Sequence, residues 1–184
     1  MKEKIFTIPN VLSFVRIGLI PFIAIFYFNE KTYLTVLIIV LSALTDIVDG
    51  FIARKFNMIS ALGKALDPIA DKLTLLTLLT CLCLKHFSII FLLLLFVVKE
   101  LIVGIEGVFI LKLTKTTYSA KWYGKATTVV LYLTILILIL FDSLSENLIP
   151  FLIFISSSFI VLSLIMYSIM NIRRIFSIVR KNES

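Results

Sequence analysis

The sequence predicts an all-α integral membrane protein with six transmembrane helices. Its residues are 60% hydrophobic and 16% charged, and the mean hydropathy is +1.11. A soluble domain averages about 45–50% apolar and about 25% charged residues. The apolar residues also fall in blocks of about twenty, which is the length of helix that crosses a bilayer core. No linker, low-complexity tract or internal repeat separates these blocks, so we expect one membrane domain over residues 1–184.

The six apolar blocks are joined by short polar connections. In the first block, Pro9 suits a helix start, and Pro21 lies deeper, where we expect a kink. This block contains no small-residue cleavage site, so we expect no cleavable signal peptide. The predicted spans are Ile8 to Phe28, Tyr33 to Phe56, Ala61 to Leu84, Phe87 to Leu113, Trp122 to Phe141, and Leu148 to Asn171.

Basic residues are divided unequally between the two sides of the membrane that these spans define. One side receives only Lys31 and Lys85. The other receives Lys2, Lys4, Arg54, Lys55, Lys64, Lys112, Lys115, Lys121, Lys125, Arg173, Arg174, Arg180 and Lys181. Cytoplasmic loops carry such an excess, so we place both termini in the cytoplasm. The formal net charge of +7 then fits anionic headgroups or a phosphorylated substrate better than nucleic acid. The tail from Arg173 is expected to continue the last helix along the interface.

The stretch from Thr45 to Lys72 interrupts the apolar pattern. It reads TDIVDGFIARKFNMISALGKALDPIADK and contains four aspartates. One Asp at the centre of a membrane helix costs about 2.5–3.5 kcal/mol. Such residues are tolerated where they face an aqueous cavity, a cation, or a paired group. We therefore predict that this stretch is the functional site.

The acidic residues of this stretch form two stripes, because a helix advances about 100° per residue. The stripes are Asp46, Asp49, Gly50 and Ala53 with Arg54 on the flank, and Gly63, Asp67 and Asp71. A short connection makes the two helices antiparallel neighbours, so both stripes are expected to face one polar cleft at the cytoplasmic side. Four carboxylates in one cleft repel each other unless a cation lies among them. Oxygen ligands without His or Cys select Mg²⁺, Mn²⁺ or Ca²⁺, and two such ions can clamp a phosphoryl group in transfer.

The pattern Asp46-x2-Asp49-Gly50-x2-Ala53-Arg54-x8-Gly63-x3-Asp67-x3-Asp71 matches, without gap or substitution, the signature of the CDP-alcohol phosphatidyltransferases. The chain also resembles this family in its length and its six expected helices. The resemblance implies that Asp46, Asp49 and Asp67 hold two Mg²⁺ or Mn²⁺ ions, with Asp71 contributing to one of them. It implies that Asp71 is the general base on an alcohol, whose oxygen attacks the lipid-bearing phosphorus of CDP-diacylglycerol and releases CMP.

The resemblance further implies which residues bind the nucleotide lipid. Those expected to line the CDP pocket are Gly50, Ala53, Arg54 and Gly63, with Ser60 at the diphosphate and Asn10 nearby on the first helix. A homodimer in the cell membrane is implied by the family alone. The active site is then expected on the cytoplasmic side.

The acceptor alcohol is indicated by two regions outside the signature. The opening Ile8 to Arg16 with Pro21, and the stretch Ser119 to Lys125, look like the bacterial phosphatidylglycerophosphate synthases, and the cardiolipin synthases share the first of them. The tentative acceptor-binding residues are Lys99, Lys125 and Arg16. Two positions depart from that branch. Lys99-Glu100 stands where the synthases commonly carry Arg-Glu, and Thr127 replaces a second basic residue.

Several alternatives stay open from the sequence. Lys99 fits a structural pair with Glu100 as well as an acceptor role, Arg16 fits a snorkelling cation, and Lys125 fits a membrane anchor. Glycerol 3-phosphate is the favoured acceptor, followed by phosphatidylglycerol and then serine or inositol phosphate. A carboxylate-lined cation transporter is the rival from another class, and it predicts ionisable groups in both halves of the membrane. A catalytically inactive lipid-binding relative is disfavoured because every signature position is filled.

Overall fold

The computed structural model describes residues 8–55, 61–114, 121–141, 144–145 and 147–182. Within these ranges the side chains at 8–9, 46–47, 49–54, 61–62, 64–65, 114 and 179–182 lie outside the description. The described residues form α-helices and one 3₁₀ turn, without strands. The helices are α1 (Ile8–Phe28), α2 (Thr32–Lys55), α3 (Ala61–Lys85), α4 (Ile90–Thr114), α5 (Trp122–Leu140) and α6 (Leu148–Asn182), with the 3₁₀ turn at Phe87–Ile89.

The prediction of six helices is confirmed for the described residues. The first three helices begin and end within about one residue of the predicted bounds. The last helix is longer than its predicted span, because the basic tail from Arg173 continues it to Asn182. At about 1.5 Å per residue, its 35 residues extend about 52 Å, against a hydrocarbon core of about 30 Å.

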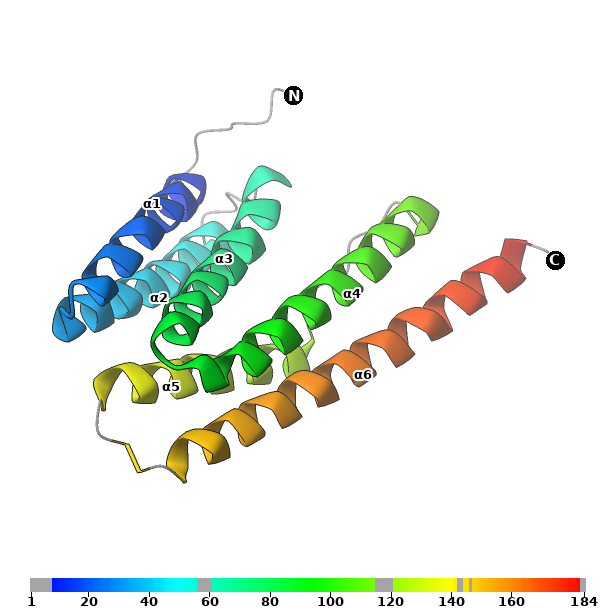
Figure 1. Cartoon of the computed structure of the whole chain (residues 1–184). Coiled ribbons are helices and arrows are strands. Elements are labelled where there is room, and N and C mark those ends of the chain that lie inside the picture. The colour runs from blue at the N-terminus through cyan, green and yellow to red at the C-terminus, as the bar shows by residue number, and fades with distance from the viewer. Residues whose placement is uncertain (1–7, 56–60, 115–120, 142–143, 146, 183–184) are drawn as a thin grey trace. The chain divides into compact units, whose positions relative to one another are not determined.

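The helices form two compact units. The first unit contains α1, α2 and α3 together with the end of α5, from residue 136 to 140. In this unit α1 packs against both α2 and α3, so the helix that opens the chain lies beside both helices of the acidic signature (Figure 1). The second unit contains α4, the rest of α5 and α6, and here α4 runs alongside α6 (Figure 1).

Three polar residues of α1 are buried, whereas many of its large apolar residues are exposed. Asn10, Ser13 and Arg16 are 1%, 0% and 2% exposed, and their spacing of three places them along one side of the helix. The large apolar residues Val11, Phe14, Val15, Phe22 and Ile25 are 45–51% exposed. This distribution is the reverse of that in a soluble helix and suits a helix with lipid on one side and a polar interior on the other.

Four helices are long and apolar enough to cross a membrane among the described residues. The candidate spans are Asn10–Phe28, Phe87–Leu113, Trp122–Leu140 and Leu148–Ile178. In α2 the described side chains give a shorter apolar helix, Thr32–Thr45, which ends where the side chains pass outside the description, and α3 is not among the candidates. These two helices contain the acidic signature, which lowers their hydropathy. That α2 and α3 also cross the membrane stays a prediction.

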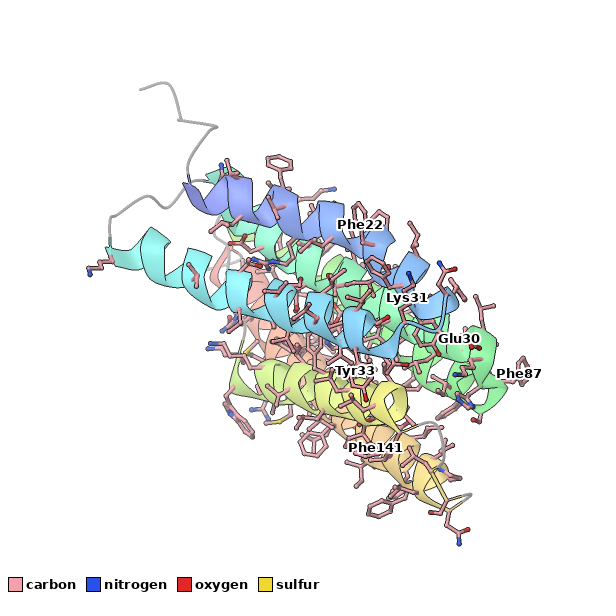
Figure 2. All side chains as sticks on the ribbon, turned by 90° about the vertical axis from the view of Figure 1, so that its left-hand side faces the viewer. Phe22, Glu30, Lys31, Tyr33, Phe87 and Phe141 are labelled. Carbon is pink, nitrogen blue, oxygen red and sulfur yellow. The ribbon has the colours of Figure 1, made fainter. Side chains whose placement is uncertain are left out.

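The turn between α1 and α2, where Glu30 and Lys31 lie (Figure 2), closes the C-terminus of α1 with two backbone hydrogen bonds. The N–H of Lys31 donates to the carbonyl of Phe26 at 3.0 Å, and the N–H of Glu30 donates to the carbonyl of Tyr27 at 3.1 Å. This pattern is a Schellman cap, whose C′ residue adopts a left-handed conformation. Glu30 occupies this position with φ of 57°, where glycine is the usual residue.

We expect the substitution Glu30→Gly to stabilise the protein by about 1 kcal/mol, because it removes the steric penalty of a Cβ at positive φ. The measurement is thermal unfolding in detergent. Glu30→Ala is the matched control, since it removes the same carboxylate but keeps the Cβ. Equal stabilisation by both substitutions would show that charge, and not backbone conformation, causes the effect.

Candidate functional site

The acidic signature lies on the two helices that flank the connection between α2 and α3. Asp46, Asp49, Gly50, Ala53 and Arg54 belong to the last turns of α2, where the structure describes the backbone but not these side chains. Ser60 lies outside the described residues. The described side chains contain no cluster of three or more His, Cys, Asp or Glu that could hold a metal ion. The side chains of Asp46 and Asp49 lie outside that description.

The α3 half of the signature is described in full. Gly63, Asp67 and Asp71 follow one another at intervals of four residues, which places them on one side of a continuous helix as predicted. Gly63 is buried, and the two carboxylates are partly buried. Their predicted roles in binding metal and nucleotide, and that of Asp71 as base, stay predictions.

Asp67 is joined to α1 by a side-chain hydrogen bond. The hydroxyl of Ser13 donates to Oδ1 of Asp67 at 2.5 Å. Among the described residues this is the only hydrogen bond or ion pair recorded for Asp67. Its second carboxylate oxygen has no recorded partner among the described residues. Hard carboxylate oxygens of this kind suit Mg²⁺ or Mn²⁺.

Ser13 was not among the residues predicted from the sequence. Its neighbours on the buried side of α1, Asn10 and Arg16, were predicted to contact CDP-diacylglycerol and the acceptor. The regular spacing of three polar residues in an otherwise apolar helix is a signal that could have identified Ser13. The structure adds that this polar side of α1 is buried at the level where Ser13 reaches α3.

The second unit contains the other two tentative acceptor residues, Lys99 and Lys125. Lys99 is 7% exposed on α4, and its Nζ forms an ion pair with Oε1 of Glu100 at 2.5 Å. The structural pair left open by the sequence is therefore present. Lys125 is exposed at the end of the first turn of α5. Arg16 belongs to the first unit.

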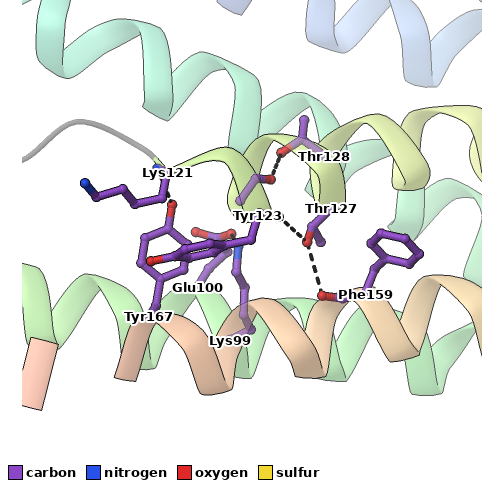
Figure 3. A network of polar contacts seen from close by, with 9 residues as sticks. Lys99, Glu100, Lys121, Tyr123, Thr127, Thr128, Phe159 and Tyr167 are labelled. Atoms are coloured by element: carbon purple, nitrogen blue, oxygen red, sulfur yellow. Dashed lines mark hydrogen bonds and ion pairs between the residues drawn. The ribbon is translucent and has the colours of Figure 1, made fainter. Parts of the chain in front are cut away.

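The beginning of α5 is held against α6 by aromatic and hydroxyl groups (Figure 3). The backbone N–H of Lys121 donates to the hydroxyl of Tyr167 at 3.0 Å. The rings of Tyr123 and Tyr167 meet edge to face with centroids 4.6 Å apart. The Thr127 hydroxyl lies 2.9 Å from the carbonyl of Tyr123 and 3.1 Å from that of Phe159 on α6 (Figure 3). Thr127 thus contributes to helix packing.

A second buried polar contact joins α4 to α6. The amide of Asn171 donates to Oε2 of Glu106 at 2.8 Å, and Asn171 is only 5% exposed. A carboxylate in the interior of an apolar helix requires such a donor. Neither this pair nor Tyr167 was singled out as a predicted site residue. Glu106 and Asn171 are 65 residues apart in the sequence, and Lys121 and Tyr167 are 46 apart, so local spacing did not indicate either pairing.

The family model for CDP-alcohol phosphatidyltransferases matches residues 6–170. The chain belongs to this family. The match covers α1 to α5 and most of α6, and it therefore includes both the acidic signature and the helices of the second unit.

Curated relatives extend the comparison. Over 136 residues, the chain is 41% identical to the CDP-diacylglycerol–glycerol-3-phosphate 3-phosphatidyltransferase of Aquifex aeolicus, which covers 70% of this chain and 73% of that protein. Over 87 residues it is 45% identical to the cardiolipin synthase (CMP-forming) / mitochondrial hydrolase fusion protein of Schizosaccharomyces pombe, covering 47% of this chain and 14% of that protein. Over 72 residues it is 49% identical to the human cardiolipin synthase (CMP-forming), covering 39% and 24%. The chain thus spans less than two thirds of the length of these two cardiolipin synthases.

The close contact of α5 with α6 gives a prediction at Gly124. A Cβ at this position would overlap the hydroxyl oxygen of Tyr167 and would lie 3.1 and 3.2 Å from its ring carbons Cε2 and Cζ. We expect Gly124→Ala to destabilise the protein by about 1–3 kcal/mol in thermal or denaturant unfolding, as overpacking does. In a Tyr167→Phe background the same substitution should cost less, because the overlapping hydroxyl is gone.

Gly104→Ala is the matched control for this experiment. A Cβ at Gly104 meets no atom within 4 Å, so the substitution should be neutral or stabilising through helix propensity. An equal loss of stability from Gly124→Ala with and without the Tyr167 hydroxyl would contradict the assignment of the contact.

Proposed function

We propose that this protein transfers the phosphatidyl group of CDP-diacylglycerol to glycerol 3-phosphate, giving phosphatidylglycerophosphate and CMP. The observation that carries the proposal is the uninterrupted acidic signature inside a family match over residues 6–170. The acceptor is supported by the alignment with the Aquifex aeolicus enzyme, which covers most of both chains. The proposed site faces the cytoplasm, because the basic residues gather at that end of the expected spans.

In the proposed reaction Asp71 accepts the proton of the acceptor hydroxyl. The freed oxygen forms a new bond to the phosphorus that bears diacylglycerol, and the anhydride bond to the CMP phosphate breaks. CMP leaves with the bonding electron pair. Placing acceptor and phosphorus in one cleft contributes through proximity, and the carboxylate contributes as general base, typically by about 10²–10⁴-fold.

Two divalent cations belong to this proposal. Asp46, Asp49, Asp67 and Asp71 would hold them, and the donor set of carboxylate oxygens fits Mg²⁺ or Mn²⁺. When bound, such ions neutralise the diphosphate and the charge that develops on the leaving phosphate. Arg54 would add a further positive charge to the nucleotide end, and Gly50 and Gly63 would allow a close approach of the ligand to the backbone. Ala53, Ser60 and Asn10 would complete the nucleotide-lipid pocket, and the homodimer expected from the family stays part of the proposal.

A cardiolipin synthase-type reaction is the second candidate. It uses the same donor and releases CMP, but its acceptor is phosphatidylglycerol. The similarity to the two cardiolipin synthases favours it, although that similarity covers less than half of this chain in each case. The two reactions differ in the acceptor and share the proposed chemistry of the acidic site.

An acceptor screen tests the proposal. The protein is purified into liposomes with CDP-diacylglycerol and Mg²⁺, and CMP release is followed with glycerol 3-phosphate, phosphatidylglycerol, serine, inositol phosphate or buffer. We expect release that depends on glycerol 3-phosphate, stops with EDTA and returns with added Mg²⁺ or Mn²⁺. Release with phosphatidylglycerol alone would establish the second candidate. Absence of release with every acceptor would favour the transporter or an inactive relative.

The proposed base gives a separate prediction. Asp71→Asn should lower kcat by about 10²–10⁴-fold because an amide cannot accept the hydroxyl proton, while binding of CDP-diacylglycerol is largely kept. CMP release and lipid binding are measured on the same preparation. Glu30→Gln is the matched control, since it neutralises an exposed carboxylate in the turn between α1 and α2. Activity of the Asp71 variant close to wild type would exclude this residue as the base.

A further inference from the structure

The hydrogen bond from Ser13 to Asp67 differs from the other described hydroxyl contacts of the buried Ser and Thr residues. Ser13 is fully buried on α1, and its acceptor is a carboxylate on a different helix. By contrast, Thr74 and Thr127 donate to backbone carbonyls, and Thr134 pairs with another hydroxyl, that of Ser156. A hydrogen bond to a charged acceptor is about twice as strong as one between neutral groups.

The chemistry of this contact suits a group that orients a ligand. An Asp carboxylate rotates broadly about its last side-chain torsion, and a donor on one oxygen restricts that rotation. Ser13 is neutral, so it leaves the negative charge of Asp67 available, whereas a Lys or Arg partner would neutralise that charge and compete with a cation. The hydroxyl occupies Oδ1, and Oδ2 has no recorded partner among the described residues. One oxygen is thereby held and the other is presented.

The helix frame makes this restraint stiff. Ser13 lies between Asn10 and Arg16 on the buried side of α1, and α1 packs along α3. The hydroxyl therefore comes from a packed helix and not from a loop. Donors that hold metal-binding carboxylates in this way typically change metal affinity by about 10–100-fold when removed.

We infer that Ser13 is a positioning residue that orients the Asp67 carboxylate for a divalent cation. This inference rests on the proposed function, in which Asp67 is one of the metal ligands. Ser13 itself contacts neither the reacting phosphorus nor the acceptor in this assignment. Its effect is expected on metal affinity first, and on turnover only through the fraction of protein that has metal bound.

The test compares Ser13→Ala with Ser13→Thr and with Ser163→Ala. Ser163 is also fully buried, on α6, and its hydroxyl has no partner among the described residues, so it controls for loss of a buried hydroxyl. Mn²⁺ binding without substrate is measured from the metal-dependent rise in unfolding temperature, and the metal dependence of CMP release is measured in parallel. We expect Ser13→Ala to raise the apparent dissociation constant for Mn²⁺ about tenfold or more. Ser13→Thr, which keeps the hydroxyl, should restore affinity to within about threefold of wild type, and Ser163→Ala should leave it unchanged.

The outcomes separate this inference from a purely structural role. If Ser13→Ala lowers the unfolding temperature without metal but keeps the wild-type response to Mn²⁺, the contact only packs α1 on α3 and the inference is overturned. Should Ser13→Ala not fold, Ser13→Cys replaces it, because a thiol is a weak donor of similar shape. Wild-type Mn²⁺ affinity in that variant would also overturn the inference.

The same experiment distinguishes a failure of the Ser13 positioning role from a failure of the proposed transferase function. If wild-type protein binds Mn²⁺ and Ser13→Ala loses affinity, yet no acceptor supports CMP release, then the positioning role stands and the transferase assignment fails. If wild-type protein shows CMP release that is independent of metal and no Mn²⁺-dependent stabilisation, then the positioning role fails while the transferase assignment is kept.

Discussion

The free-energy cost of placing carboxylates among apolar helices is the constraint on which this structure depends. Water is absent from the bilayer core, so an acidic side chain there requires a donor, a cation or a hydrated cavity. In the described part of the first unit, α1 meets this requirement by turning Asn10, Ser13 and Arg16 inward and exposing Phe14 and Phe22. The same requirement thus explains both the polar side of α1 and the acidic side of α3, and the hydrogen bond from Ser13 to Asp67 joins the two helices.

The second unit solves the related problem of holding helices together without a hydrophobic driving force between them. Lipid tails are as apolar as leucine, so polar contacts and close packing stabilise helix pairs, each hydrogen bond by about 0.6–2 kcal/mol. Thr134 pairs with Ser156, Asn171 with Glu106, and Tyr167 with the backbone of Lys121. Three polar contacts thus join α6 to neighbouring segments of the second unit. The lack of a side chain at Gly124 lets the Tyr167 hydroxyl reach the first turn of α5.

Sequence periodicity predicted the features that depend on residues close to one another in the chain. The bounds of α1, α2 and α3 and the stripe of Gly63, Asp67 and Asp71 follow from apolar block lengths and from the turn of a helix. Contacts between helices did not follow, since Ser13 and Asp67 are separated by 54 residues and their pairing depends on how α1 packs on α3. The apolar content also marked α2 as a full span; its described side chains give an apolar helix over Thr32–Thr45, and the full span stays a prediction.

The two candidate acceptors differ in the negative charge that a binding site would have to neutralise. A phosphomonoester such as that of glycerol 3-phosphate carries nearly two negative charges at neutral pH, whereas a phosphodiester headgroup carries one. In the second unit, the Lys99–Glu100 pair sums to zero charge, so a phosphate there would compete with Glu100 for the Lys99 ammonium. Thr127 is engaged between two backbone carbonyls and contributes no positive charge. Within the second unit, a phosphomonoester would therefore be favoured by positive charge outside the Lys99–Glu100 pair, for which the exposed Lys125 is a candidate.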